Sequence, residues 1–172
     1  TAAEVTIPSE IDGYIVQKIY NGIFKNNKAV EKVSFPETIE AVGNEIFYGC
    51  TALTTVNFHS GLTNIGNSMF YGCTALTEFE VPEGVTTIGN NAFSNCSNLT
   101  DIDLPETLLT IDYYAFYNCT GLVSIDLPDS VTGISGYAFR GCANLSEVRL
   151  PASWKTVYVG SSTYGYDSPF YG

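Results

Sequence analysis

The chain has 172 residues, 45% hydrophobic and 15% charged, so it carries enough apolar side chains for a core, and disorder is not expected. Seven Lys and Arg residues stand against eighteen Asp and Glu residues, a formal net charge of −11, and the interval 33–139 contains no Lys or Arg. Because nucleic-acid binding needs cationic side chains along the contact, the charge argues against a nucleic-acid partner. No stretch approaches the roughly 20 consecutive apolar residues of a membrane-spanning helix, so no membrane insertion is expected.

At the N-terminus, Val5-Thr6-Ile7-Pro8 predicts a short strand that stops at a proline. Pro8 lies 11 residues before Ile19, whereas Pro36 lies six residues before Val42, so residues 1–23 are interpreted as an atypical first copy of the repeat that follows. Thr1 is not an initiator Met, and no targeting segment is present. We therefore expect the chain to be a fragment of a longer protein.

Residues 24–159 are interpreted as regular repeats of 23 residues, since several columns of residues recur with that step. The Phe column contains Phe24, Phe47, Phe70, Phe93, Phe116 and Phe139, and the Cys column contains Cys50, Cys73, Cys96, Cys119 and Cys142. Apolar columns at the positions of Ile88, Leu99 and Ile102 keep the same register. Chance does not supply so many columns in phase.

One unit shows how the repeat folds. The segment 99–105 alternates polar and apolar residues before Pro105, which predicts one strand per 23 residues with one face buried. A return segment, 85–89, and a turn of irregular or helical backbone lead to the next unit. Each unit is thus predicted to be one coil of a solenoid, and since a single coil cannot bury its apolar side, identical positions must stack into a continuous core.

At the C-terminus, residues 160–172 are either an irregular tail that caps the core or the start of a further repeat. Phe170-Tyr171-Gly172 repeats Phe47-Tyr48-Gly49, but only after eight additional residues. Terminal repeats of solenoids generally need a cap, which is compatible with the first alternative.

The segment from Ile88 to Pro105 fits Ile-Gly-x-x-Ala-Phe-x-x-Cys-x-x-Leu-x-x-Ile-x-Leu-Pro, and this pattern resembles the BspA-type, or Treponema pallidum-type, leucine-rich repeats. The resemblance covers essentially the whole chain and implies a β-rich α/β solenoid, namely a right-handed curved leucine-rich-repeat solenoid with a parallel inner β-sheet, in a single domain of residues 1–172. It also implies an extracellular or cell-surface bacterial protein that acts as an adhesin or interaction module. The chain departs from the pattern at His59, Asp112, Ser135, Tyr20 and Asn27.

Neither a catalytic nor a metal site is predicted. Each Cys is alone in its coil, without the close Cys pairs of metal sites, and parallel stacking would not point neighbouring thiols at each other, so we expect free, buried thiols. The single His, His59, has no nucleophile or metal motif beside it and is interpreted as structural. The chain is accordingly interpreted as non-enzymatic, without a cofactor, and any active site would lie outside residues 1–172.

Carboxylates gather on the outward side of the predicted sheet. The two outward columns contain Lys32, Thr55, Glu78, Asp101, Ser124 and Glu147, and Ser34, Asn57, Glu80, Asp103, Asp126 and Arg149. Two like charges about 5 Å apart repel by ~0.8 kcal/mol even in bulk water, so stability alone does not favour the acidic residues at the centre. This concave sheet is either a solvated face that keeps the solenoid soluble or a binding face for a basic or cation-bridged partner, and no loop has the ligand spacing of a calcium site.

A column of Tyr48, Tyr71 and Tyr117 follows the Phe column by one residue. These side chains either cover the core or form an aromatic stripe that contacts protein or glycan. The function predicted from the sequence is non-enzymatic recognition of a protein partner, such as a basic host extracellular or cell-surface protein, through the acidic sheet and the Tyr edge. The alternative is a structural spacer of a larger surface protein, with no ligand of its own. The sequence does not predict the oligomeric state.

Overall fold

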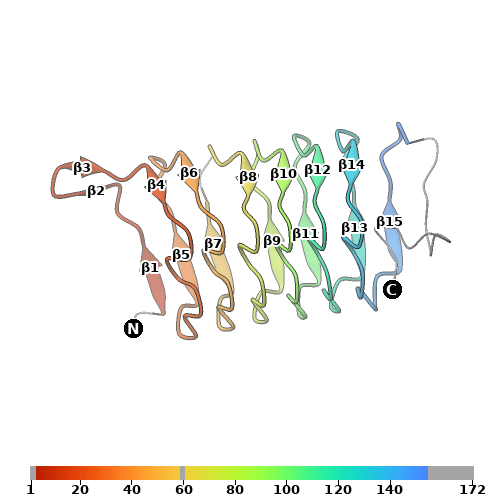
Figure 1. The fold of residues 1–172 in the computed structure, drawn as a ribbon, viewed down its shortest axis with the longest axis horizontal. Helices are drawn as coiled ribbons and strands as arrows, with labels where there is room; N and C mark the ends of the chain where they lie inside the picture. Colours follow the sequence, from red (N-terminus) through yellow and green to blue (C-terminus); the bar gives the residue numbers. More distant parts are fainter. Residues whose placement is uncertain (1–2, 59–60, 155–172) are drawn as a thin grey trace.

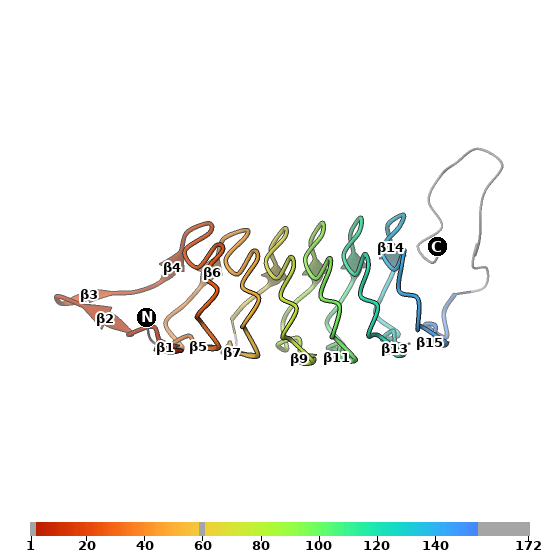
Figure 2. The same ribbon diagram turned by 90° about the horizontal axis from the view of Figure 1, so that it is seen from below.

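Each 23-residue unit forms one coil of a parallel β-solenoid, and the coils stack along the long axis of the molecule (Figures 1 and 2). The structure is a computed structural model that describes residues 3–58 and 61–154. Those residues contain strands and turns but no helix, so the turn of each coil is not helical. The predicted solenoid, with its 23-residue period and parallel pairing, is confirmed.

The strands expected before each proline form one row, which we call the long-strand ladder (lower row of Figure 1). It consists of β1 (Glu4–Thr6), β5 (Lys32–Ser34), β7 (Thr55–Asn57), β9 (Glu78–Glu80), β11 (Asp101–Asp103), β13 (Ser124–Asp126) and β15 (Glu147–Arg149). Paired strands keep the predicted register; Phe79, for example, lies opposite Ile102. The ladder is not one continuous sheet, because pairing is continuous only within β1-β5-β7, β9-β11 and β13-β15.

A second row, the short-strand ladder, lies in the return segments (upper row of Figure 1). It consists of β4 (Lys18–Ile19), β6 (Ala41–Val42), β8 (Asn64–Ile65), β10 (Thr87–Ile88), β12 (Thr110–Ile111) and β14 (Gly133–Ile134). The prediction of one strand per unit was therefore wrong. The amides here bond to carbonyls one coil back, as Gly89 N does to Ile65 O at 2.9 Å, and strands of two residues are too short to show an alternating pattern.

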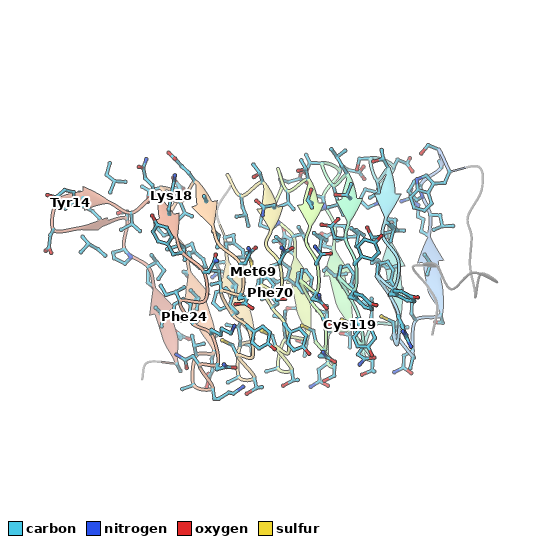
Figure 3. All side chains as sticks on the ribbon, viewed as in Figure 1. Tyr14, Lys18, Phe24, Met69, Phe70 and Cys119 are labelled. Carbon is cyan, nitrogen blue, oxygen red and sulfur yellow. The ribbon has the colours of Figure 1, made fainter. Side chains whose placement is uncertain are left out.

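The Phe column forms the centre of the core. Phe47, Phe70, Phe93 and Phe116 are fully buried, and successive rings are near parallel with centroids 5.1 to 5.4 Å apart. Figure 3 shows Phe24, Phe70 and Cys119 within this stack of coils. Stacking of identical residues thus buries the apolar side that no single coil could bury.

The turn after each core Phe needs a left-handed backbone two residues later. Asn26, Asn95 and Asn118 hold this position with φ of 61°, 61° and 57°, and Gly49 and Gly72 hold it with φ of 69° and 70°. Gly and Asn adopt this conformation more readily than other residues, which explains why only these two types fill the column.

A hairpin precedes the regular coils. β2 (Glu10–Ile11) and β3 (Tyr14–Ile15) pair antiparallel, and the Asp12-Gly13 turn between them has positive φ at both residues, as a two-residue hairpin of type I′ requires. The hairpin projects from the end of the solenoid, and Tyr14 on it is 78% exposed (Figures 1 and 3). The extra residues between Pro8 and Ile19 therefore build an element that the repeat lacks. The tail predicted at 160–172 lies outside the described residues.

Candidate functional site

The outward positions of the long-strand ladder carry the carboxylates that the sequence placed there. Glu78 and Asp101 are register partners, as are Glu80 and Asp103, and all four side chains are exposed. Stacked parallel strands lie about 4.8 Å apart, so these four residues form two adjacent pairs of like charge. We call this group, Glu78, Glu80, Asp101 and Asp103, the acidic face.

Cations neutralise carboxylates near the two ends of the same ladder. Lys32 Nζ lies 3.0 Å from Glu4 Oε1, and Arg149 Nη1 donates to Asp126 Oδ1 at 2.5 Å. This hydrogen bond and the charge of Asp126 raise the pKa of Arg149. Asp126 therefore does not add to the unneutralised charge at the centre, although its position in the column suggested that it would.

The remaining predicted ladder residues lie on other strands than the acidic face. Thr55 and Asn57 lie on β7, where the Asn57 side chain donates to Ser34 Oγ, and Glu147 lies on β15 opposite Ser124. β7 and β9 are not paired, so Thr55 and Asn57 are not bridged to the acidic face by backbone hydrogen bonds.

A pocket of about 470 Å³ opens between β7 and β9, and we call it the sheet groove. Its lining residues are Thr54, Thr55, Val56, Asn57, Phe58, Glu78, Phe79, Glu80, Pro82, Asp101 and Asp103. The lining combines all four residues of the acidic face with apolar side chains from the inward side of the strands. The sequence did not predict this hollow.

The predicted Tyr column is divided into two parts. The rings of Tyr48 and Tyr71 stack at 4.6 Å, and Lys25 Nζ lies 4.7 Å from the Tyr48 centroid. Tyr117 instead meets Tyr114 edge to face at 5.6 Å. The position between the two parts belongs to the buried Ser94, and the three predicted Tyr side chains are half-buried, so they cover the turns without forming one continuous stripe.

The five cysteines are free and buried, as expected. Each thiol donates to the carbonyl of the core Phe 26 residues earlier; Cys96 Sγ lies 3.1 Å from Phe70 O. Burial raises the pKa of the Cys50 thiol to about 11 and that of Cys142 to about 12, and it raises the pKa of Cys96 well above the ordinary value. A protonated, enclosed thiol is a poor nucleophile and a poor metal ligand, so this column is structural.

The structure contains an asparagine ladder that was not predicted from the sequence. It contains Asn21, Asn44, Asn67 and Asn90, in which the side-chain oxygen of each of the first three accepts the backbone N–H of the next, at 2.8 to 2.9 Å. The spacing of 23 residues was the available signal.

The glycine of the Ile-Gly motif makes room for this ladder. A Cβ at Gly66 would lie 2.9 Å from Asn44 Oδ1, and a Cβ at Gly89 would lie 2.6 Å from Asn67 Oδ1. In the next coil Asp112 takes the Gly position and Tyr113 the Asn position, and no side-chain bond from Asn90 to Tyr113 continues the ladder in the described residues. The departures from the repeat pattern thus coincide with the end of the ladder.

Within residues 3–58 and 61–154, no group of three or more His, Cys, Asp or Glu side chains is arranged to hold a metal ion. No described segment forms a helix with the length and hydropathy needed to cross a bilayer. His59, interpreted above as structural, lies outside the described residues.

Comparison with known families matches residues 17–146 and 86–165 to the BspA type leucine-rich repeat region, in six copies. No curated protein matches the chain significantly.

Solved structures give the same fold. The chain is similar to the crystal structure of the T. pallidum leucine-rich repeat protein, with 33% identity and a TM-score of 0.83 over 87% of this chain and 71% of that one. It is also similar to a leucine-rich cell surface protein from Faecalibacterium prausnitzii, with 29% identity and a TM-score of 0.68 over 95% of this chain and 52% of that one. A leucine-rich repeat protein from Eubacterium ventriosum matches with 26% identity and a TM-score of 0.72 over 96% of this chain. The chain spans about half the length of the last two proteins (52% and 47%).

Proposed function

Because the chain belongs to the BspA-type leucine-rich repeat family, we propose that it is a non-enzymatic protein-recognition module of a bacterial cell-surface or secreted protein. In this proposal residues 1–172 act as one domain, and the acidic face binds a protein partner that presents basic side chains. The surface location is supported by the description of the F. prausnitzii relative as a cell surface protein.

The observation that carries the proposal is the absence of cations at the centre of the ladder. Among the described residues, none of the four carboxylates of the acidic face takes part in an ion pair. Yet the same ladder places Lys32 and Arg149 beside acidic residues near its ends. Adjacent unneutralised charges oppose folding slightly, and a basic partner would remove that repulsion on binding while being steered toward the face.

Contacts at the margin extend the proposed site. Thr55 and Asn57 on β7 offer hydrogen-bond donors and acceptors at its rim, whereas Glu147 on β15 lies beyond β13 and would contact only a partner long enough to reach that strand. Tyr48 and Tyr71 form a separate aromatic surface on the turn edge and would contact only a partner large enough to reach around the coil.

The test removes the charge without touching the core. We expect the triple variant Glu80→Gln, Asp101→Asn, Asp103→Asn to bind a basic extracellular protein more slowly, because a single-signed field accelerates association. Biotinylated host surface proteins would be captured on the wild-type chain, and the most abundant captured protein would be purified. The rate at which this protein associates with the chain would then be measured at low and at physiological ionic strength. The wild-type rate should fall as salt rises, since exposed charges are screened beyond about 8 Å at physiological ionic strength.

A matched control neutralises three exposed carboxylates elsewhere, with Glu10→Gln, Asp12→Asn and Glu37→Gln. It changes the net charge by the same amount, so only a local effect separates the two triple variants. Equal rates for the two would contradict the proposed face. Loss of binding only on replacing Tyr48, Tyr71 and Tyr117 by Ser would move the contact to the turn edge, and no captured partner at all would favour the structural spacer.

A further inference from the structure

The long-strand ladder opens between β7 and β9. β7 pairs in register with β5, and β9 with β11, but β7 and β9 share no pairing (Figure 1). In the coil that holds β7 and β8, the long strand β7 pairs with the preceding coil, whereas the short strand β8 pairs with β10 of the following coil and not with β6. The two strands of this coil thus pair in opposite directions along the solenoid, which leaves an opening between β7 and β9 on the long-strand side.

The opening leaves backbone groups without partners. Between β9 and β11, Thr100 N donates to Thr77 O at 2.8 Å and Val81 N donates to Asp103 O at 2.9 Å. The corresponding bonds one coil earlier, from Thr77 N to Thr54 O and from Phe58 N to Glu80 O, are absent from the described residues. Both sides of the sheet groove therefore carry a donor and an acceptor that a strand would otherwise satisfy.

The floor of the sheet groove is apolar. Val56 is only half-buried, whereas Val33 and Ile102 in the same column are buried. Phe58 and Phe79 also line the groove, and their rings pack inward against Phe70, at 6.4 Å and 4.8 Å between centroids. The core below the opening is therefore filled by rings, and the hollow faces outward.

Within the described residues, the step between β11 and β13 also lacks pairing and the equivalent backbone bonds, but its inward side chains stay covered. Ile102 and Ile125 at that step are both buried. Between β7 and β9, by contrast, the inward Val56 is half-buried and the step forms a pocket that Val56, Phe58 and Phe79 line together with the acidic face. At about 470 Å³ this pocket lies within the range of ~300–1,000 Å³ typical of ligand sites.

We propose that the sheet groove binds one extended segment of a partner protein in which basic side chains alternate with apolar ones. The segment's backbone would bond to the free groups of Thr54, Thr77, Phe58 and Glu80, as in recognition by strand addition. Alternation follows from the strand period of two: one side of the segment would meet Val56 and the rings, and the other would meet the acidic face. This inference rests on the proposed function, because it names the form in which the basic partner is recognised at that face.

The probe is a fluorescein-labelled peptide, Thr-Lys-Val-Lys-Val-Lys-Thr, with blocked ends. Its matched control carries N-methyl groups on both Val residues, which removes two backbone donors and keeps the charge and side chains. Fluorescence anisotropy with residues 1–172 should show binding of the first peptide and a loss of about tenfold for the second, equivalent to about 1.4 kcal/mol. Amide hydrogen exchange should show slower exchange at Thr77 and Phe58 when the first peptide is bound.

A pair of variants tests the groove itself. Val56→Trp fills the hollow and keeps every carboxylate, so we expect about tenfold weaker peptide binding. Val148→Trp makes the same change in the same column on β15, where the side chain is 36% exposed, and should bind within about twofold of wild type.

The outcomes separate this inference from the proposed function. If the N-methylated peptide binds as well as its parent, or if exchange at Thr77 and Phe58 is unchanged on binding, the groove is not a strand site. The proposed function would still hold in that case, provided that a basic protein partner binds the acidic face in a salt-sensitive way. If neither peptide binds, the strand proposal is wrong whatever the protein partner does. If the chain alone sediments as a dimer that Val56→Trp converts to a monomer, the occupant is a second copy and this proposal is overturned.

Discussion

Removing the ring of Phe93 tests whether stacking of identical positions holds the solenoid together. Phe93 is fully buried, and its ring lies 5.1 Å from that of Phe70, 5.3 Å from that of Phe116 and 5.3 Å from that of Phe79. Phe93→Ala would therefore remove contacts to three rings in three coils. Burial loss and the cavity together predict a cost of about 3–5 kcal/mol.

The position of a Phe in the stack determines how much its replacement by Ala lowers the free energy of unfolding. Phe24 is only half-buried and, among the described residues, its ring stacks on Phe47 alone, with centroids 5.4 Å apart. With one stacked neighbour and less buried area, Phe24→Ala should cost about 1–2 kcal/mol. Tyr20 is 82% exposed, so Tyr20→Ala should change the free energy of unfolding by no more than about 0.5 kcal/mol.

Equilibrium unfolding in urea, followed by far-ultraviolet circular dichroism, measures these differences. In a chain of this size each kcal/mol lowers the melting temperature by about 2–4 °C, so Phe93→Ala should melt roughly 6–20 °C below wild type. The single Trp, Trp154, donates its indole N–H to Val131 O in the last described coil, so its fluorescence reports whether that coil unfolds with the rest. A Phe93→Ala variant no less stable than Tyr20→Ala would refute the argument that coils are held by stacking.

Two further predictions concern the inward columns. At pH 8 a thiol reagent should label almost none of the five cysteines before unfolding. Because burial raises the pKa values of these thiols, the free energy of unfolding should be at its full value below pH ~8.5 and should fall as the pH rises toward the pKa values of the folded state. This fall should be less steep in a Cys96→Ala variant. In the asparagine ladder, Asn67→Ala should lower the free energy of unfolding by about 1 kcal/mol, and Gly89→Ala should lower it by more. Because a methyl group added at position 89 would collide with the Asn67 amide, the double variant should lose less than the sum of the two single losses. Strictly additive losses in urea unfolding would contradict the contact.

The stacked columns could be predicted because they depend only on the period. Every inward residue meets its own counterpart one coil away, so the register of Phe, Cys and strand residues follows once the 23-residue step is known. The same step could have revealed the asparagine ladder and the pairing of Asp126 with Arg149, since both join residues one coil apart.

The sheet groove could not be predicted in this way, because it arises where two neighbouring coils stop repeating. Phe79 stands in a column otherwise filled by Val and Ile, and Phe58 follows β7, so two rings enter the core at this step. The sequence shows the larger residues, but whether the strands pack around them or separate depends on the surrounding side chains. The short-strand ladder was missed for a simpler reason: two residues give no period.

The architecture separates the side chains that hold the fold from those that could bind. Inward positions are constrained by the coils above and below, whereas the outward side chains of Glu78 and Asp103 contribute little to packing and can vary without loss of the core. Charge therefore accumulates over β9 and β11 at a small electrostatic cost, beside the unpaired step between β7 and β9 where the sheet groove opens. A loss of binding after a change on this face, with the melting temperature unchanged, consequently reports on recognition and not on folding.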